Sequence, residues 1–290
     1  MKNTVTVFLD FTEPQSLRSA VDLILHMNLL FEFMLHEKQT LTSFSIIDQP
    51  RSRQRTSTDV YITTAGEDGK PEGNFRDCLI SGSLNQLEFE HVATSWLSAG
   101  TGLRNARRRC LEGIREGNSY TPDRLVGAAN AFDLLSSSSF GIRHSTPADV
   151  KALISEVRRK AREIADDAYR ERLLNALRRA TGMNLVEKIA HRLSRVPECL
   201  RNQMPQAVQV VAGCVRARNY FVHGSNPKLP LEVVYSLSSF FTDTLEFIFV
   251  VSDLADCGWN AERWLNEGTG HSPFHNYLLS YSQNLERLRV

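Results

Sequence analysis

The sequence predicts a mostly α-helical protein, in which a helical bundle formed by residues 83–290 follows a small α+β module formed by residues 1–82. Three observations support this prediction. Apolar residues recur at three- and four-residue spacing through the long patterns after residue 84, which is typical of amphipathic helices. The short alternating segments typical of strands lie before that point. The 290 residues, 42% of them hydrophobic and 23% charged, suffice for one substantial core and a small appendage.

The N-terminal module is expected to contain a helix and three short strands. Apolar side chains at helical spacing predict the helix over residues 15–36. Alternating patterns predict strands over residues 43–47, 60–64 and 75–81, and the Gly- and Pro-containing segment 66–73 is a strong turn signal. So few strands and one helix need another surface to pack against, and we expect that surface in the bundle.

The bundle is expected to consist of helices separated by Pro- and Ser-containing connections. Capping residues such as Thr121 and Thr146, each followed by Pro, mark helix starts. The two most apolar segments are expected to lie at the centre of the bundle, and they are residues 206–223 and 231–256. The other predicted helical segments are 84–96, 124–135, 146–179 with one break, 185–193 and 273–288.

Charge and apolar patterning narrow the classes of function. The 34 basic and 33 acidic residues leave a formal charge of +1, so a polyanion must be bound by a local basic patch. The longest unbroken apolar run, residues 247–251, and the polar N-terminus predict no membrane-spanning segment and no secretion signal. We therefore expect a cytoplasmic protein that does not bind membranes.

The cysteine pattern argues against a disulfide framework and against a thiolate zinc site. The cysteines are widely scattered and include no Cys-x-x-Cys pair. We expect reduced, mostly buried side chains at Cys78, Cys110, Cys199, Cys214 and Cys257.

The most informative segment is the end of the first of the two apolar helices. An apolar stripe through Val208 and Val215 becomes polar at Arg218 and Asn219. Arg218 and His223 are five positions apart, about 140° around the helix axis, so only the long stem of the arginine lets both heads approach one phosphate. An Arg and an Asn that face inward cost stability unless they are paired or hydrated, which indicates a cleft or a subunit seam.

Composition alone explains the bare spacing but not the full motif. An Arg five positions before a His is expected about 0.7 times by chance in a chain of this composition. With Asn directly after the Arg and Gly directly after the His, the expected number falls to about 0.002. The structural alternative is a helix end, where basic residues and a His-Gly pair are common.

Residues 218–224, Arg-Asn-Tyr-Phe-Val-His-Gly, resemble the Arg-x(4–6)-His signature of the HEPN superfamily, and most closely the Arg-Asn-x-x-x-His core of its ApeA-type branch. The order of the helical segments over residues 84–265 is also similar to that branch. The predicted bundle is therefore similar to a HEPN helical domain. This chain has Asp133 where family members often carry Glu, and its N-terminal region is shorter than in many ApeA-type proteins, as in a short or truncated member.

The resemblance implies a metal-independent endoribonuclease of bacterial anti-phage, abortive-infection defence that needs no cofactor. Its expected substrate is RNA, with tRNA anticodon loops as the expected target, cut by attack of the ribose 2′-hydroxyl. Arg218, Asn219 and His223 are the expected catalytic residues. His223 suits proton transfer near neutrality, Arg218 suits the phosphate oxygens, and Asn219 would orient His223 or the phosphate.

Further residues are expected to assist this chemistry. Asp133 and Tyr220 are candidate accessory residues, and Asp133 could polarise His223, pair with Arg218 across the bundle, or cap a helix. Candidate RNA-binding residues are Arg104, Arg107, Arg108, Arg109 and Arg216.

The resemblance also implies partners. HEPN nucleases usually act as pairs of such helices, so a homodimer through the HEPN helices is expected. A phage-derived or regulatory trigger would control the activity. The alternatives are a non-catalytic HEPN interaction or nucleotide-binding module, and the toxin half of a toxin–antitoxin pair.

Overall fold

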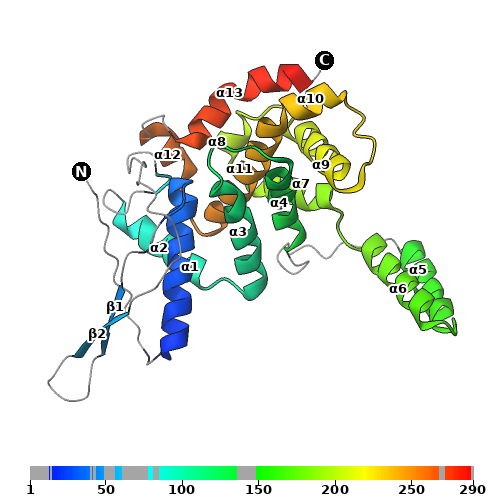
Figure 1. Cartoon of the computed structure of the whole chain (residues 1–290), viewed down its shortest axis with the longest axis horizontal. Helices are drawn as coiled ribbons and strands as arrows, with labels where there is room; N and C mark the ends of the chain where they lie inside the picture. The colour runs from blue at the N-terminus through cyan, green and yellow to red at the C-terminus, as the bar shows by residue number, and fades with distance from the viewer. Residues whose placement is uncertain are drawn as a thin grey trace.

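The structure is a computed structural model, and the part of the chain that it describes is mostly helical (Figure 1). It describes residues 13, 15–39, 41, 44–48, 56–60, 78–80, 85–135, 148–267 and 272–288. The elements are α1 (Leu17–Leu35), β1 (Phe44–Asp48), β2 (Thr56–Val60), α2 (Gln86–Leu97), α3 (Thr101–Ile114), α4 (Pro122–Asp133), α5 (Ala148–Arg162), α6 (Asp167–Thr181), α7 (Leu185–Arg195), α8 (Glu198–Arg201), α9 (Ala207–His223), α10 (Leu231–Ser236), α11 (Ser238–Asp256), α12 (Ala261–Glu267) and α13 (Pro273–Leu288).

Helix α11 forms the centre of the fold. Most of its side chains are buried, polar ones such as Glu246 and Asp253 among them, because α4, α7, α9 and α13 pack around it. The predicted segment 231–256 is therefore central, as expected, although Leu237 divides it into α10 and α11. Among the described residues, neither α11 nor any other helix is long and apolar enough to cross a membrane.

The N-terminal helix belongs to the same helical body. Leu30 and Phe33 of α1 are fully buried in the hydrophobic cluster that also contains residues of α3, α4 and α11. Helix α1 packs directly on α2 and α3. The mostly helical fold is thus confirmed, but a separate α+β module in front of it is not supported. The boundary between residues 82 and 83 stays a prediction.

In the region where the sequence predicts strands, the structure describes one two-stranded sheet. β1 and β2 pair antiparallel, with Phe44 opposite Val60. β1 matches the predicted strand at 43–47, whereas β2 ends at Val60, the first residue of the predicted strand at 60–64, whose other residues lie outside the described part of the chain. Most of the predicted strand at 75–81 lies outside the described residues, and the described Cys78–Ile80 segment is not a strand.

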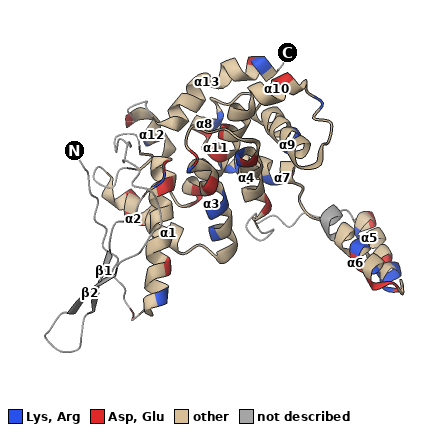
Figure 2. Cartoon of the chain, viewed as in Figure 1, with Lys and Arg blue, Asp and Glu red and all other residues tan. Residues whose placement is uncertain are grey.

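Helices α5 and α6 form a hairpin that projects from the rest of the chain in Figure 1. The break that the sequence predicts within 146–179 falls between these two helices. Both helices carry basic and acidic side chains (Figure 2). On α5, Lys160 forms an ion pair with Glu156 one turn earlier, and Arg159 forms one with Glu163 just after the helix ends. Helices α3, α8 and α12 were not among the predicted segments.

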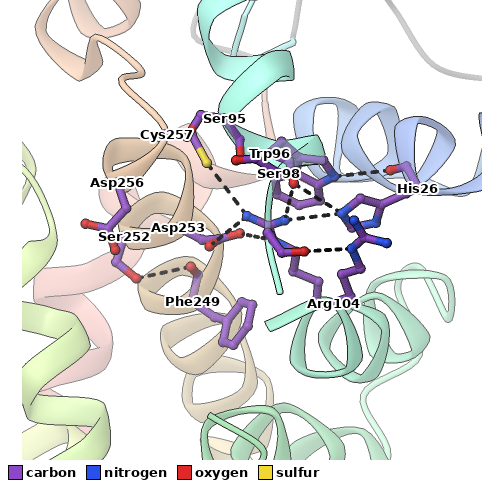
Figure 3. A network of polar contacts seen from close by, with 12 residues as sticks. His26, Ser95, Trp96, Ser98, Arg104, Phe249, Ser252, Asp253, Asp256 and Cys257 are labelled. Carbon is purple, nitrogen blue, oxygen red and sulfur yellow. Dashed lines mark hydrogen bonds and ion pairs between the residues drawn. The ribbon is translucent and has the colours of Figure 1, made fainter. Parts of the chain in front are cut away.

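A buried network of polar contacts ties α3 to α11 (Figure 3). Arg107 Nε donates to Asp253 Oδ2 at 2.7 Å, and both side chains are 1% exposed. The Arg107 guanidinium also lies 3.5 Å from the centre of the Trp96 ring and donates to the Trp96 carbonyl oxygen at 2.9 Å. Such a buried pair is stable only while each partner remains, because a lone buried charge is costly.

A second buried ion pair fixes α4 against α11. Arg124 donates from Nε and Nη2 to the two carboxylate oxygens of Glu246, at 2.9 and 2.8 Å, in a bidentate arrangement. Burial acts against the charged guanidinium, yet the hydrogen bonds and negative charge of Glu246, together with Tyr120 and Asp243, outweigh it and raise the pKa of Arg124. The position of α4 along the central helix is therefore set by a specific contact.

Candidate functional site

The last turn of α9 brings the motif to the surface. Gly224 adopts a left-handed conformation with φ 64°, and its backbone N–H donates to the Tyr220 carbonyl oxygen. This conformation favours glycine and ends the helix immediately after His223. The middle of α9, residues 210–217, is largely buried and α9 packs on α4, α7 and α11, whereas His223 is exposed. One rigid helix therefore carries both an anchored stem and an accessible tip.

Arg218 and His223 meet at this tip. Arg218 Nη1 lies 3.4 Å from His223 Nε2, and the same nitrogen donates to Asn219 Oδ1 at 3.1 Å. A guanidinium has no acceptor, so this contact is a hydrogen bond only when Nε2 of His223 carries no proton. The long Arg218 stem thus spans the angle between the two positions, as the spacing predicts.

A second helix holds the other side of the guanidinium. Arg218 Nη2 donates to Asn130 Oδ1 at 3.0 Å and lies 4.0 Å from Asp133 Oδ2, and both partners are on α4. Lys188 Nζ of α7 approaches Asp133 Oδ1 at 3.6 Å and donates to the Asp133 carbonyl oxygen. The 4.0 Å contact is compatible with pairing between Asp133 and Arg218, but Lys188 lies closer to this carboxylate, and an accessory role of Asp133 stays a prediction.

Asn130 is the contact that sequence reasoning missed. It is the single polar side chain in the otherwise apolar segment 127–132 of α4. That isolation is a weak signal of an inward polar partner, because an unpaired amide in an apolar surface costs stability.

Tyr220 faces a different neighbour. Its ring centre lies 5.3 Å from that of Phe221, and a hydrogen bond with Tyr235 of α10 raises the pKa of Tyr220. Positions 218 and 220 are about 200° apart around α9, so these contacts lie on the other side of the helix from Arg218. An accessory role of Tyr220 in the chemistry stays a prediction.

Two of the arginines expected to contact RNA make hydrogen bonds within the fold. Arg104 donates to the carbonyl oxygens of Leu97 and Ala99 at 2.9 and 2.8 Å, which satisfies the end of α2. Arg107 is buried against Asp253, so the prediction that it binds RNA is wrong. Nothing in the local Arg-rich segment indicates this, because Asp253 lies 146 positions away in the sequence.

The other three arginines remain accessible to a ligand. Arg108 and Arg216 are exposed, and the half-exposed Arg109 pairs with Glu112 on the same helix. Surface pairs of this kind contribute little stability and exchange readily for a phosphate. Their contact with RNA stays a prediction.

Comparison with known proteins identifies the family. Residues 126–263 match the family model described as Apea-like HEPN, and this range includes Asn130, Asp133, Arg218, Asn219 and His223. No curated protein and no solved structure matches the chain. HEPN domains are generally ribonucleases, so the match supports a nuclease-type domain. The match over residues 126–263 therefore supports an ApeA-type HEPN family member.

Proposed function

We propose that this protein is a metal-independent endoribonuclease whose site is formed by Arg218, Asn219 and His223. The observation that carries the proposal is the 3.4 Å approach of Arg218 Nη1 to His223 Nε2 at the exposed end of α9. The two groups that a phosphate-transfer reaction within RNA needs, a proton acceptor and a fixed cation, therefore lie within reach of one phosphate.

The reaction uses the nucleophile that RNA itself carries. The unprotonated Nε2 of His223 accepts the proton of a ribose 2′-hydroxyl, whose oxygen then bonds to the adjacent phosphorus. Arg218 stabilises the negative charge on the non-bridging oxygens of the five-coordinate intermediate. The bond from phosphorus to the 5′-oxygen breaks, and a proton passes to that oxygen. The products are a 2′,3′-cyclic phosphate and a 5′-hydroxyl.

Exchange of Arg218 for Lys tests the need for a planar, forked cation. Lys keeps the positive charge but loses the two terminal nitrogens that contact Asn219 and Asn130. We expect Arg218→Lys to lower kcat for RNA cleavage about 10- to 100-fold, measured on total tRNA in EDTA with gel-resolved products. The exposed Arg216→Lys on the same helix is the matched control and should retain kcat. Full activity of Arg218→Lys would rule out the proposed fork.

We propose further that two copies of α9 pair in the active protein. Apolar side chains remain exposed on the same side of α9 as Arg218: Val208 and Val222 are 58% and 42% exposed. A twofold axis through this surface would bury these side chains and bring two Arg218–His223 sets to one RNA strand. The second imidazole could then protonate the leaving oxygen.

A charge placed in this surface tests the dimer. We expect Val222→Asp to convert a dimer to a monomer in sedimentation velocity and to lower cleavage at the same protein concentration. Leu279→Asp on α13, at an 80% exposed position, should change neither. A wild-type monomer that is fully active, or a Val222→Asp protein that stays dimeric, would contradict the proposed pairing.

We propose the anticodon loop of tRNA as the substrate and anti-phage defence in the cytoplasm as the setting, with a phage-derived or regulatory trigger. In-line attack requires a nucleotide freed from helical stacking, and exposed loops provide it. A non-catalytic HEPN module is the second candidate. It is favoured by one observation, that the terminal nitrogens of Arg218 already contact Asn219, Asn130 and His223.

A further inference from the structure

We infer that Asn130 is a positioning residue for Arg218: its neutral amide oxygen fixes the guanidinium without cancelling the charge that the phosphate needs. This inference rests on the proposed nuclease function. It assigns to α4 an uncharged hydrogen-bond acceptor for Arg218, which neither the Arg–His motif nor the acidic Asp133 provides.

Two amide oxygens set the orientation of the guanidinium. Each terminal nitrogen of Arg218 makes one short hydrogen bond to an amide, Nη1 to Asn219 at 3.1 Å and Nη2 to Asn130 at 3.0 Å. Asn219 is on the same helix as Arg218, so Asn130 is the partner that fixes Arg218 relative to the rest of the fold. A bond at each end of a planar group restricts its rotation, which a single contact leaves free.

The remaining contacts of Arg218 are longer and leave room for exchange. Arg218 Nη1 lies 3.4 Å from His223, and Nη2 lies 4.0 Å from an Asp133 carboxylate that is 45% exposed. Asp133 also faces Lys188 at 3.6 Å, which divides its charge between two cations. Phosphate oxygens can therefore replace the His223 and Asp133 contacts while the two amide bonds persist.

The chemistry of the partner at position 130 decides how much charge reaches the substrate. An amide oxygen accepts a hydrogen bond and carries no net charge, so the full positive charge of Arg218 is retained. A carboxylate at the same 3.0 Å would form a charge-assisted pair and oppose a phosphate at the same group.

The helix that carries Asn130 is itself held rigidly. The buried bidentate pair between Arg124 and Glu246 anchors α4 to α11 less than two turns before Asn130. Asn130 Oδ1 therefore projects from a fixed element, as preorganised sites require.

Kinetics of Asn130 variants on tRNA, with a double-mutant cycle, test this role. We expect Asn130→Ala to lower kcat about 10- to 100-fold while KM changes less than about threefold, because a misplaced group costs rate more than affinity. We expect Asn130→Asp, which keeps the acceptor but adds a charge, to recover most of kcat and to raise KM about fivefold or more. In an Arg218→Ala background, measured under single-turnover conditions, Asn130→Ala should have no further effect. Leu134→Ala, an exposed position at the end of α4, is the control.

The outcomes separate failure of this role from failure of the nuclease proposal. An active wild-type protein with an unimpaired Asn130→Ala variant overturns the positioning role and leaves the nuclease intact. An equal loss from Asn130→Ala with and without Arg218 also overturns it, because a merely structural effect would not depend on Arg218. If the wild-type protein neither cleaves nor binds RNA, the nuclease proposal fails first and the role of Asn130 falls with it.

Discussion

Replacing His223 with Ala is expected to lower the rate of RNA cleavage about 100- to 10,000-fold, the range that general acid–base catalysis contributes. The physical reason is the loss of the unprotonated Nε2 that lies 3.4 Å from Arg218 and is available to the 2′-hydroxyl. Because His223 is exposed at the last position of α9, its truncation should leave the core intact. Single-turnover cleavage of tRNA by wild-type and His223→Ala proteins measures the effect.

A second exposed histidine provides the control for a general effect of removing an imidazole. His91 on α2 is also exposed, and His91→Ala should cleave at the wild-type rate. Both variants should unfold at the wild-type midpoint. Undiminished cleavage by His223→Ala would refute its catalytic role, and an equal loss in His91→Ala would show that the effect is not specific to the site.

Replacing Asp253 with Ala is expected to lower the free energy of unfolding by about 3–5 kcal/mol. Asp253 is the carboxylate that faces the buried Arg107, and Arg192 Nη2 also lies 3.8 Å from it. The substitution would leave the Arg107 charge buried without a carboxylate partner, next to the Trp96 carbonyl oxygen and ring, His26 and the Cys257 sulfur. Urea unfolding monitored by circular dichroism measures the loss.

A second acidic residue of α11 provides the comparison for Asp253. Asp256 is 30% exposed and pairs with Arg192 and Arg195. Asp256→Ala should cost only about 1 kcal/mol, since water can replace these contacts. The claim is that burial makes the Arg107–Asp253 pair costly to break. Equal losses of unfolding free energy in the two variants, or a loss below about 1 kcal/mol for Asp253→Ala, would contradict it.

The helical pattern of the sequence predicts the fold well where the period of apolar residues is strong. The predicted segment 273–288 coincides with α13, and 206–223 differs from α9 by one residue. The N-terminal helix and its packing against the bundle are also predicted, but not that it shares one hydrophobic cluster with the bundle. That relation depends on which helices Leu30 and Phe33 contact, and periodicity describes only the face that is buried.

The sequence predicts the contacts of the candidate site that lie within one helix, but not those that join two helices. The spacing of Arg218 and His223 is enough to predict their approach, because the geometry of a helix is regular. The contact of Arg218 with Asn130 joins residues 88 positions apart, and no local pattern encodes it. Arg107 fails as an RNA contact for the same reason, since its partner Asp253 is 146 positions away in sequence.

Analysis of the RNA ends formed by the wild-type protein in EDTA tests the proposed chemistry most directly. Attack by the 2′-hydroxyl, assisted by His223 and Arg218, predicts a 2′,3′-cyclic phosphate on one fragment and a 5′-hydroxyl on the other. It also predicts no cleavage when the nucleotide at the cut site is 2′-deoxy. Cleavage that EDTA abolishes, a 5′-phosphate with a 3′-hydroxyl, or cutting at the 2′-deoxy nucleotide would contradict it.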